Sequence, residues 1–187
     1  MNRKCGFTLL ELIMTLAIAA IVITLGVPGF QEVIRNNRIT AQTNELITAL
    51  NLARSEAIKR GVPVTMCKTS YSVTATSPPT ACNTSADWQQ GWIIYADPGS
   101  NDGVIKTSEG DEILRVKEAM PTGFKLGTGG TFTNWIAYLP TGFNRGSGGL
   151  GNDTFRLCLD GNQQTGKEII VNQAGRAWVK EGASSCP

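Results

Sequence analysis

The stretch GFTLLELIMTLAIAA, residues 6–20, places one carboxylate, Glu11, inside an otherwise uncharged and mostly apolar run. Glu11 is the only ionisable side chain in residues 7–30. A hydrocarbon core about 30 Å thick is crossed by about 20 helical residues, so this run is long enough to span a membrane as a helix. An unpaired charge at the centre of a bilayer costs about 2.5–3.5 kcal/mol even on insertion scales. Glu11 therefore needs either a partner or a function.

The flanks of the run favour a retained membrane helix over a secretory signal peptide. A signal peptide has a shorter apolar core, followed by a cleavage site made of small residues. Here the run closes with VPGF, residues 27–30, and has no Ala-x-Ala-like site. Arg3 and Lys4 precede the run, and basic residues stay on the cytoplasmic side of a membrane. We therefore expect the chain after residue 30 to lie outside the cytoplasm.

The segment KCGFTLLEL, residues 4–12, resembles the signature of type IV prepilins. That signature is a short basic leader ending in glycine, followed by Phe, Thr, two apolar residues, Glu and Leu. The resemblance implies that a dedicated peptidase cleaves after Gly6 and N-methylates Phe7, so that residues 1–6 are a leader. Pro28, which is followed by Gly29 near the end of the run, also matches type IV pilins. We expect a kink at these two residues because proline removes a helical hydrogen bond.

The same resemblance supplies a partner for Glu11. Cleavage would leave a cationic amine on Phe7, and the resemblance implies that Glu11 neutralises this amine on a neighbouring subunit as helices stack in a filament. Opposite charges attract far more strongly in a low dielectric than in water. We therefore interpret Glu11 as an assembly residue. The alternative is a charge tolerated near the edge of the membrane.

Residues 31–60 are predicted to continue the helix as an amphipathic segment. Apolar residues recur there close to the 3.6-residue period of a helix. Gly61 and Pro63 end the pattern. The apolar stripe expected in the core of the protein comprises Leu46, Leu50, Ala53 and Ala57.

After Gly61 the sequence changes to short β-type runs separated by turn residues. We expect strands at residues 62–67, 71–75, 91–96, 112–116, 124–126, 135–139, 154–159, 168–172 and 177–180. Loops are expected at residues 76–87, 97–103 and 141–153, and a hairpin turn at GNQQTGKE, residues 161–168. The predicted fold class is α+β. It consists of a long N-terminal helix, transmembrane over residues 7–30, packed through residues 31–60 on an antiparallel sheet formed by residues 61–187.

Four segments of the β-rich half resemble FimT/GspH-type minor pilins and pseudopilins in their order. They are GWIIYADPGSNDGV (91–104), DEILRV (111–116), FRLCLD (155–160) and KEIIVNQAGRAWV (167–179). With the leader, this resemblance covers most of the chain. It implies a protein of the bacterial inner membrane with its C-terminal domain in the periplasm. Such a protein joins a type IV pilus or a type II secretion pseudopilus, near the tip as part of a priming complex. The implied partners are the prepilin peptidase, the inner membrane and other minor and major pilins or pseudopilins.

Four cysteines follow the apolar run, and a fifth, Cys5, precedes it. None of them has the Cys-x-x-Cys spacing of a zinc site. An even set outside the cytoplasm suggests two disulfides, for which three pairings exist. We favour the pairs that stay local in sequence, with four free buried thiols as the alternative. The favoured pairs are Cys67–Cys82 and Cys158–Cys186.

The composition argues against catalysis. The chain contains 0 histidines, which removes the commonest general base and the Ser-His and Cys-His pairs. We expect no enzymatic activity, no cofactor and no metal. The alternative of an exported hydrolase is not supported by any catalytic group of residues in the sequence. The Asp/Asn-rich residues 97–112 leave a calcium site outside the EF-hand class as an alternative. Pro98 occupies the position where an EF-hand needs its first acid.

The segment NQAGRAWVK, residues 172–180, suggests a nucleic-acid ligand. Some FimT-like pilins that act in natural transformation bind DNA through Gly-Arg-x-Arg. This chain has Gly175 and Arg176, but Trp178 stands where the second arginine would be. Trp178 would stack on a base, and further positive charge would come from Lys180, Lys167 and Arg145. The net charge of +2 predicts no strong affinity. The structural alternative is a turn at Gly175, a buried Trp178 and an ion pair at Arg176.

Overall fold

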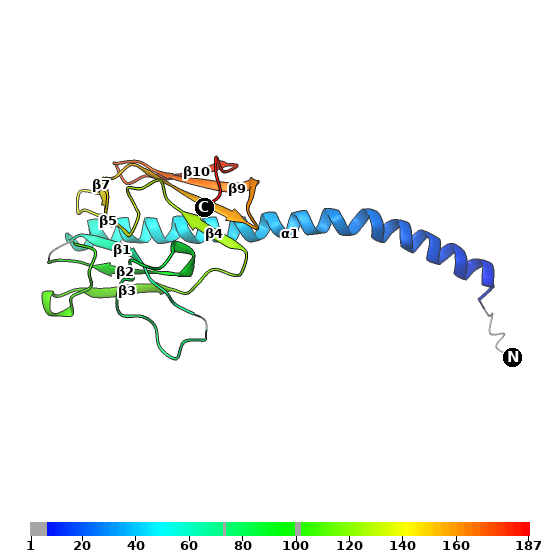
Figure 1. Ribbon diagram of the computed structural model, residues 1–187, viewed down its shortest axis with the longest axis horizontal. Coiled ribbons are helices and arrows are strands. Elements are labelled where there is room, and N and C mark those ends of the chain that lie inside the picture. The colour runs from blue at the N-terminus through cyan, green and yellow to red at the C-terminus, as the bar shows by residue number, and fades with distance from the viewer. Residues whose placement is uncertain (1–6, 73, 100–101) are drawn as a thin grey trace. The chain divides into compact units, whose positions relative to one another are not determined.

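The computed structural model describes residues 7–72, 74–99 and 102–187 (Figure 1). The chain divides into two compact units, Met1–Arg38 and Ile39–Pro187. Helix α1 (Leu9–Arg60) contributes to both units. Cys5 and Gly6, the predicted end of the leader, lie outside the described residues.

In the first unit, α1 exposes its large apolar side chains. Their exposed fractions run from 53% at Leu12 to 77% at Leu9. Within the described part of the chain, α1 is the one helix that is long and apolar enough to cross a membrane. A contiguous apolar surface of this kind marks a contact with lipid or with another protein. The helix continues through Pro28 and Gly29, so proline does not end it, and the kink there stays a prediction.

In the second unit, one face of α1 is buried. The buried stripe comprises Ile39, Thr43, Leu46, Ala49, Leu50, Ala53 and Ala57. These positions are three or four residues apart, as one face of a helix requires, and the predicted core stripe is confirmed. The helix ends at Gly61, whose N–H donates to the Ala57 carbonyl at 3.0 Å and whose φ of +69° suits glycine.

In the described residues, ten strands form two antiparallel sheets, whereas the sequence predicted a single sheet. The six-stranded sheet has the order β3-β2-β1-β5-β6-β7 and the four-stranded sheet the order β10-β9-β8-β4. The first contains β1 (Val64–Lys68), β2 (Trp92–Ala96), β3 (Glu112–Lys117), β5 (Trp135–Tyr138), β6 (Asn144–Gly146) and β7 (Gly149–Leu150). The second contains β4 (Phe124–Gly127), β8 (Asp153–Leu159), β9 (Asn162–Val171) and β10 (Ala177–Glu181). Two short 3₁₀ helices, Trp88–Gln90 and Thr107–Glu109, complete the elements.

Three local predictions were wrong. The described residues in 71–75 form no strand. The glycine-rich residues 141–153, predicted as a loop, contain β6 and β7. The predicted turn at 161–168 is mostly strand, because β9 begins at Asn162, which already pairs with Leu159. Gly146 in β6 was interpreted as a loop residue. In the structure it lets β6 approach Thr131 closely, because a Cβ at this position would collide with the Thr131 backbone.

The main apolar core joins the buried stripe of α1 to residues of both sheets. Within it the Trp88 ring meets Phe155 edge-on with centroids 5.3 Å apart, and Trp88 Nε1 donates to the Phe132 carbonyl at 2.9 Å. A smaller cluster, Cys67, Ile93 and Tyr95, is separate from this core. Side chains of β2 alternate between the two clusters, which explains why the whole strand is buried.

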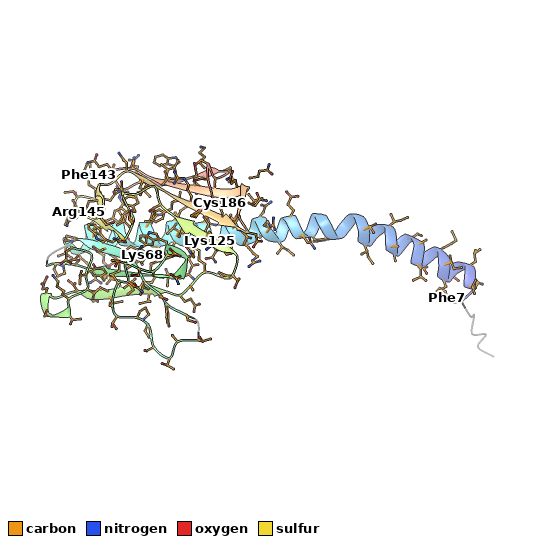
Figure 2. The ribbon with its side chains drawn as sticks, in the orientation of Figure 1. Phe7, Lys68, Lys125, Phe143, Arg145 and Cys186 are labelled. Atoms are coloured by element: carbon orange, nitrogen blue, oxygen red, sulfur yellow. A yellow bond between two sulfur atoms is a disulfide. The ribbon has the colours of Figure 1, made fainter. Side chains whose placement is uncertain are left out.

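Both disulfides favoured by the sequence are present. Cys67 pairs with Cys82 across 15 residues, and Cys158 pairs with Cys186 across 28 residues. The first ties β1 to the segment that follows it. The second ties β8 to the last residues of the chain (Cys186 is labelled in Figure 2).

The buried stripe of α1 predicts a large cost for truncation. Leu50 is 1% exposed, whereas Ile58 on the same helix is 52% exposed. Leu50→Ala is expected to lower the free energy of unfolding of the second unit by about 2–5 kcal/mol, and Ile58→Ala by less than about 1 kcal/mol. Denaturant unfolding of the full chain in micelles, followed by tryptophan fluorescence, measures both. Equal effects of the two substitutions would contradict the assignment of the buried face.

Candidate functional site

The first turn of α1 positions Glu11. The Thr8 hydroxyl accepts a hydrogen bond from the Glu11 backbone N–H at 3.3 Å, and the Thr8 carbonyl accepts one from the Leu12 N–H at 3.1 Å. Thr8 therefore caps the helix, and the sequence TLLE has the spacing of a capping box, with the acid at the third helical position. This role of Thr8 was not among the sequence predictions, although the Thr-x-x-Glu spacing indicates it.

The side chains of Phe7 and Glu11 are both exposed. Within the described residues of its own chain, Glu11 has no ion-pair partner. A carboxylate in an apolar helical surface without an internal partner is costly to transfer from water. This geometry leaves Glu11 available to a cation from outside the chain.

The residues predicted to bind DNA do not form one cationic surface. Arg145 lies on β6 of the six-stranded sheet, with its guanidinium 5.7 Å from the centre of the Trp135 ring (Figure 2). Lys167 pairs with Glu181, and Lys180 pairs with Glu168 at 3.3 Å. Both lysine charges are thus balanced by carboxylates on the neighbouring strand.

Arg176 immediately precedes β10, an edge strand, and Trp178 is the second residue of that strand. Gly175 has a φ of +74° and its N–H donates to the Asn172 carbonyl at 2.9 Å, so the predicted turn is confirmed. Trp178 is 47% exposed, and the alternative that it is buried was wrong. Arg176 is exposed and has no ion-pair partner within the described part of the chain.

The register of the sheet explains the exposure of Trp178. Ala177 and Val179 pair with Val171 and Ile169, whose side chains belong to the core. Trp178 pairs with Ile170 and therefore points to the opposite, outer face of the sheet. Thr154 pairs with Ile170 from the other side. Thr154, Ile170 and Trp178 thus form one row across three strands, here called the open row.

The next row on this face is ionic and consists of Arg156, Glu168 and Lys180. Glu168 lies 3.7 Å from Arg156 and 3.3 Å from Lys180. The Ser184 backbone N–H donates to Glu168 at 2.8 Å. Hydrogen bonds from the hydroxyl and N–H of Ser184 lower the pKa of Glu168 to about 2, with Lys180 helping and burial opposing the shift.

The last residues of the chain, 182–187, cover this ionic row. Arg156 Nε donates to the Ser184 hydroxyl at 3.2 Å, and Cys186 is bonded to Cys158. The C-terminal segment is therefore fixed to the outer face of the four-stranded sheet by one covalent bond and several hydrogen bonds, and the open row lies beside it.

Two carboxylates of the Asp/Asn-rich stretch are engaged by a lysine. Lys106 Nζ lies 2.8 Å from Asp102 and 3.3 Å from Glu109. No group of three or more His, Cys, Asp or Glu side chains in the described residues could hold a metal ion. The positive charge of Lys106 next to both carboxylates disfavours the calcium alternative.

Comparison with known proteins agrees with this anatomy. A family model described as "Type II transport protein GspH" matches residues 42–175, and one described as "Prokaryotic N-terminal methylation motif" matches residues 1–27. No curated protein matches the chain significantly.

Two solved structures share the fold. Both are crystal structures of the type IV minor pilin FimU from Pseudomonas aeruginosa PAO1, each 18% identical in sequence. The P21 form has a TM-score of 0.59 and the match covers 81% of this chain and 96% of FimU. The P65 form has a TM-score of 0.55, with 79% and 99% covered.

An apolar N-terminal helix with a methylation motif, continued into antiparallel sheets, defines the class of pilin-like proteins. Within that class, the chain belongs to the GspH family. This family consists of structural pilin and pseudopilin subunits rather than enzymes, and membership implies assembly with other pilins.

The ionic row predicts a pH-dependent stability. Because the folded pKa of Glu168 lies below its unfolded value, its contribution is present above about pH 4.5 and is lost as pH falls toward about 2. Glu168→Gln is expected to lower the free energy of unfolding at pH 7 by about 1.5–3 kcal/mol. The difference from the wild type should shrink below pH 4.5 or so, as urea titrations at several pH values would show.

The matched control is Glu181→Gln on the same sheet. The Glu181 side chain is 81% exposed, so its removal should change stability by less than about 1 kcal/mol at any pH. A pH-independent loss in Glu168→Gln would show that its charge is not what stabilises the C-terminal segment.

Proposed function

We propose that the chain is a minor pilin or pseudopilin, cleaved after Gly6, methylated on Phe7 and held in the bacterial inner membrane by residues 7–30. Its C-terminal domain faces the periplasm until the subunit joins a type IV pilus or a type II secretion pseudopilus. The subunit acts at or near the tip, as part of a priming complex. The prepilin peptidase and other minor and major pilins are its partners.

One observation carries this proposal. The first part of α1 exposes a continuous apolar surface whose single charge, Glu11, has no ion-pair partner in the described residues. A terminal amine on Phe7 of an adjacent subunit supplies the missing cation. The charge pair sets the stagger between helices, because it forms only when Glu11 of one helix lies level with the terminus of the next.

Removing the charge tests this assignment. Glu11→Ala is expected to leave cleavage intact and to abolish incorporation into filaments, since loss of one partner of a buried ion pair costs about 3–5 kcal/mol. Immunoblots of sheared filaments measure incorporation, and mass spectrometry of the N-terminus measures cleavage and methylation.

Glu32→Ala is the matched control, because Glu32 is an exposed acid on the same helix beyond the apolar run. It should assemble normally. Normal incorporation of Glu11→Ala would refute the charge pair, and an uncleaved Met1 in native filaments would refute the leader. Purification of tagged protein, with identification of the pilins that accompany it, decides between a pilus and a pseudopilus.

The alternative function, DNA binding for uptake in natural transformation, is supported by the joint exposure of Arg176 and Trp178. With one unpaired arginine in this segment, we expect at most weak gel retardation of DNA at low salt. It should vanish at physiological salt and in Arg176→Ala, because non-specific affinity scales with the number of phosphates neutralised. Arg115→Ala, which removes an exposed arginine from β3, is the charge-matched control. Retardation that persists at physiological salt would instead make DNA binding the leading function.

A further inference from the structure

The open row borders a hollow that the proposed assembly function does not use. The hollow measures about 350 Å³ and is lined by residues 152–154 at the start of β8, residues 170–172 at the end of β9, and Trp178 on β10. This volume lies within the range of small-ligand sites, about 300–1,000 Å³. The indole of Trp178 is one wall of the hollow and is half exposed to water.

Three uncharged polar groups converge on the same hollow. The side-chain oxygen of Asn152 accepts the Gln173 N–H at 2.6 Å, and that of Asn172 accepts the Arg176 N–H at 3.0 Å. These bonds fix the orientation of both amides. Within the described part of the chain, the NH₂ groups of the two side chains have no hydrogen-bond acceptor. The Thr154 hydroxyl likewise has none there. The hollow therefore presents fixed hydrogen-bond donors beside an aromatic face.

Apart from Arg176, the charged side chains near the hollow are balanced within the chain. The Asp153 carboxylate accepts backbone N–H groups of Gly129, Phe132 and Thr154, each at 2.7 Å. Lys180, in the adjacent ionic row, is balanced by Glu168. A polyanion gains affinity by neutralisation of several phosphates, and among the described basic residues around the hollow only Arg176 lacks an ion-pair partner. The chemistry of this surface thus favours a neutral ligand over nucleic acid.

We propose that this hollow binds a neutral oligosaccharide. A pyranose ring has an apolar C–H face, which stacks on the electron-rich face of an indole. Its hydroxyl groups accept hydrogen bonds from the amide NH₂ groups of Asn152 and Asn172. With the Thr154 hydroxyl, they can either donate or accept a hydrogen bond. The ligand class is therefore an uncharged, hydroxyl-rich glycan chain. It lies across β8, β9 and β10 with one sugar ring stacked on Trp178.

Titration of the full chain with glycans tests this proposal. The protein is kept in nanodiscs or in a detergent without a sugar headgroup, and the probes are cellopentaose, chitopentaose and maltopentaose. At least one of them should shift the indole N–H resonance of Trp178 at millimolar concentration. Trp178→Ala should weaken that binding about tenfold, as loss of a stacking platform does.

The matched control is Phe143→Ala, which removes an exposed aromatic ring from the turn before β6 (Figure 2). It should bind like the wild type. The proposal is overturned if none of the three glycans binds, or if Trp178→Ala binds equally well. It is also overturned if single-stranded DNA displaces the glycan, or if Trp178→Ala only loses filament incorporation, which would make Trp178 a subunit contact. Because Glu11 is untouched, these outcomes leave the assembly proposal standing.

Discussion

The second unit depends on the burial of one narrow stripe of α1 against residues of both sheets. The side chains of Ala49, Ala53 and Ala57 are small and buried, so the backbone of α1 can approach the sheets closely. Arg54 lies beside the stripe and donates to the carbonyls of Gly142 at 3.2 Å and Ala174 at 3.1 Å. Those carbonyls belong to turns after β5 and after β9, one from each sheet. A single helical side chain therefore ties the two sheets to the same helix.

The sequence predicted the parts of the fold that are local. The helical period at Leu46, Leu50 and Ala53 and the apolar strands β2 and β8 were visible because each pattern lies within one segment. The division into two sheets was not, since it depends on which strands pair. The strand β6 was missed because the glycines in the surrounding sequence resemble a loop, and the close approach of Gly146 to Thr131 is a tertiary property.

The candidate site shows the same limit. Gly6, Phe7 and Glu11 were recognisable as a contiguous motif, and Thr8 carried a signal that went unused. The five residues assigned to DNA were chosen from a resemblance to Gly-Arg-x-Arg, from the stacking capacity of Trp178 and from positive charge, without knowledge of their partners. The carboxylates that pair with the two lysines, Glu181 and Glu168, lie one strand away, and only the register of β9 with β10 shows that both lysines are neutralised. Alternation along β10 placed Trp178 outside the core, and that alternation has a direction only once the register is known.

The order in which the chain is made has a consequence for the stripe on α1. Helix α1 is synthesised before β8 and β9. Part of the core that covers its stripe, however, comes from Phe155 on β8 and from Ile169 and Val171 on β9. Contacts so distant in sequence form slowly. In the nascent protein, the apolar stripe of α1 therefore stays partly uncovered until β8 and β9 have been synthesised.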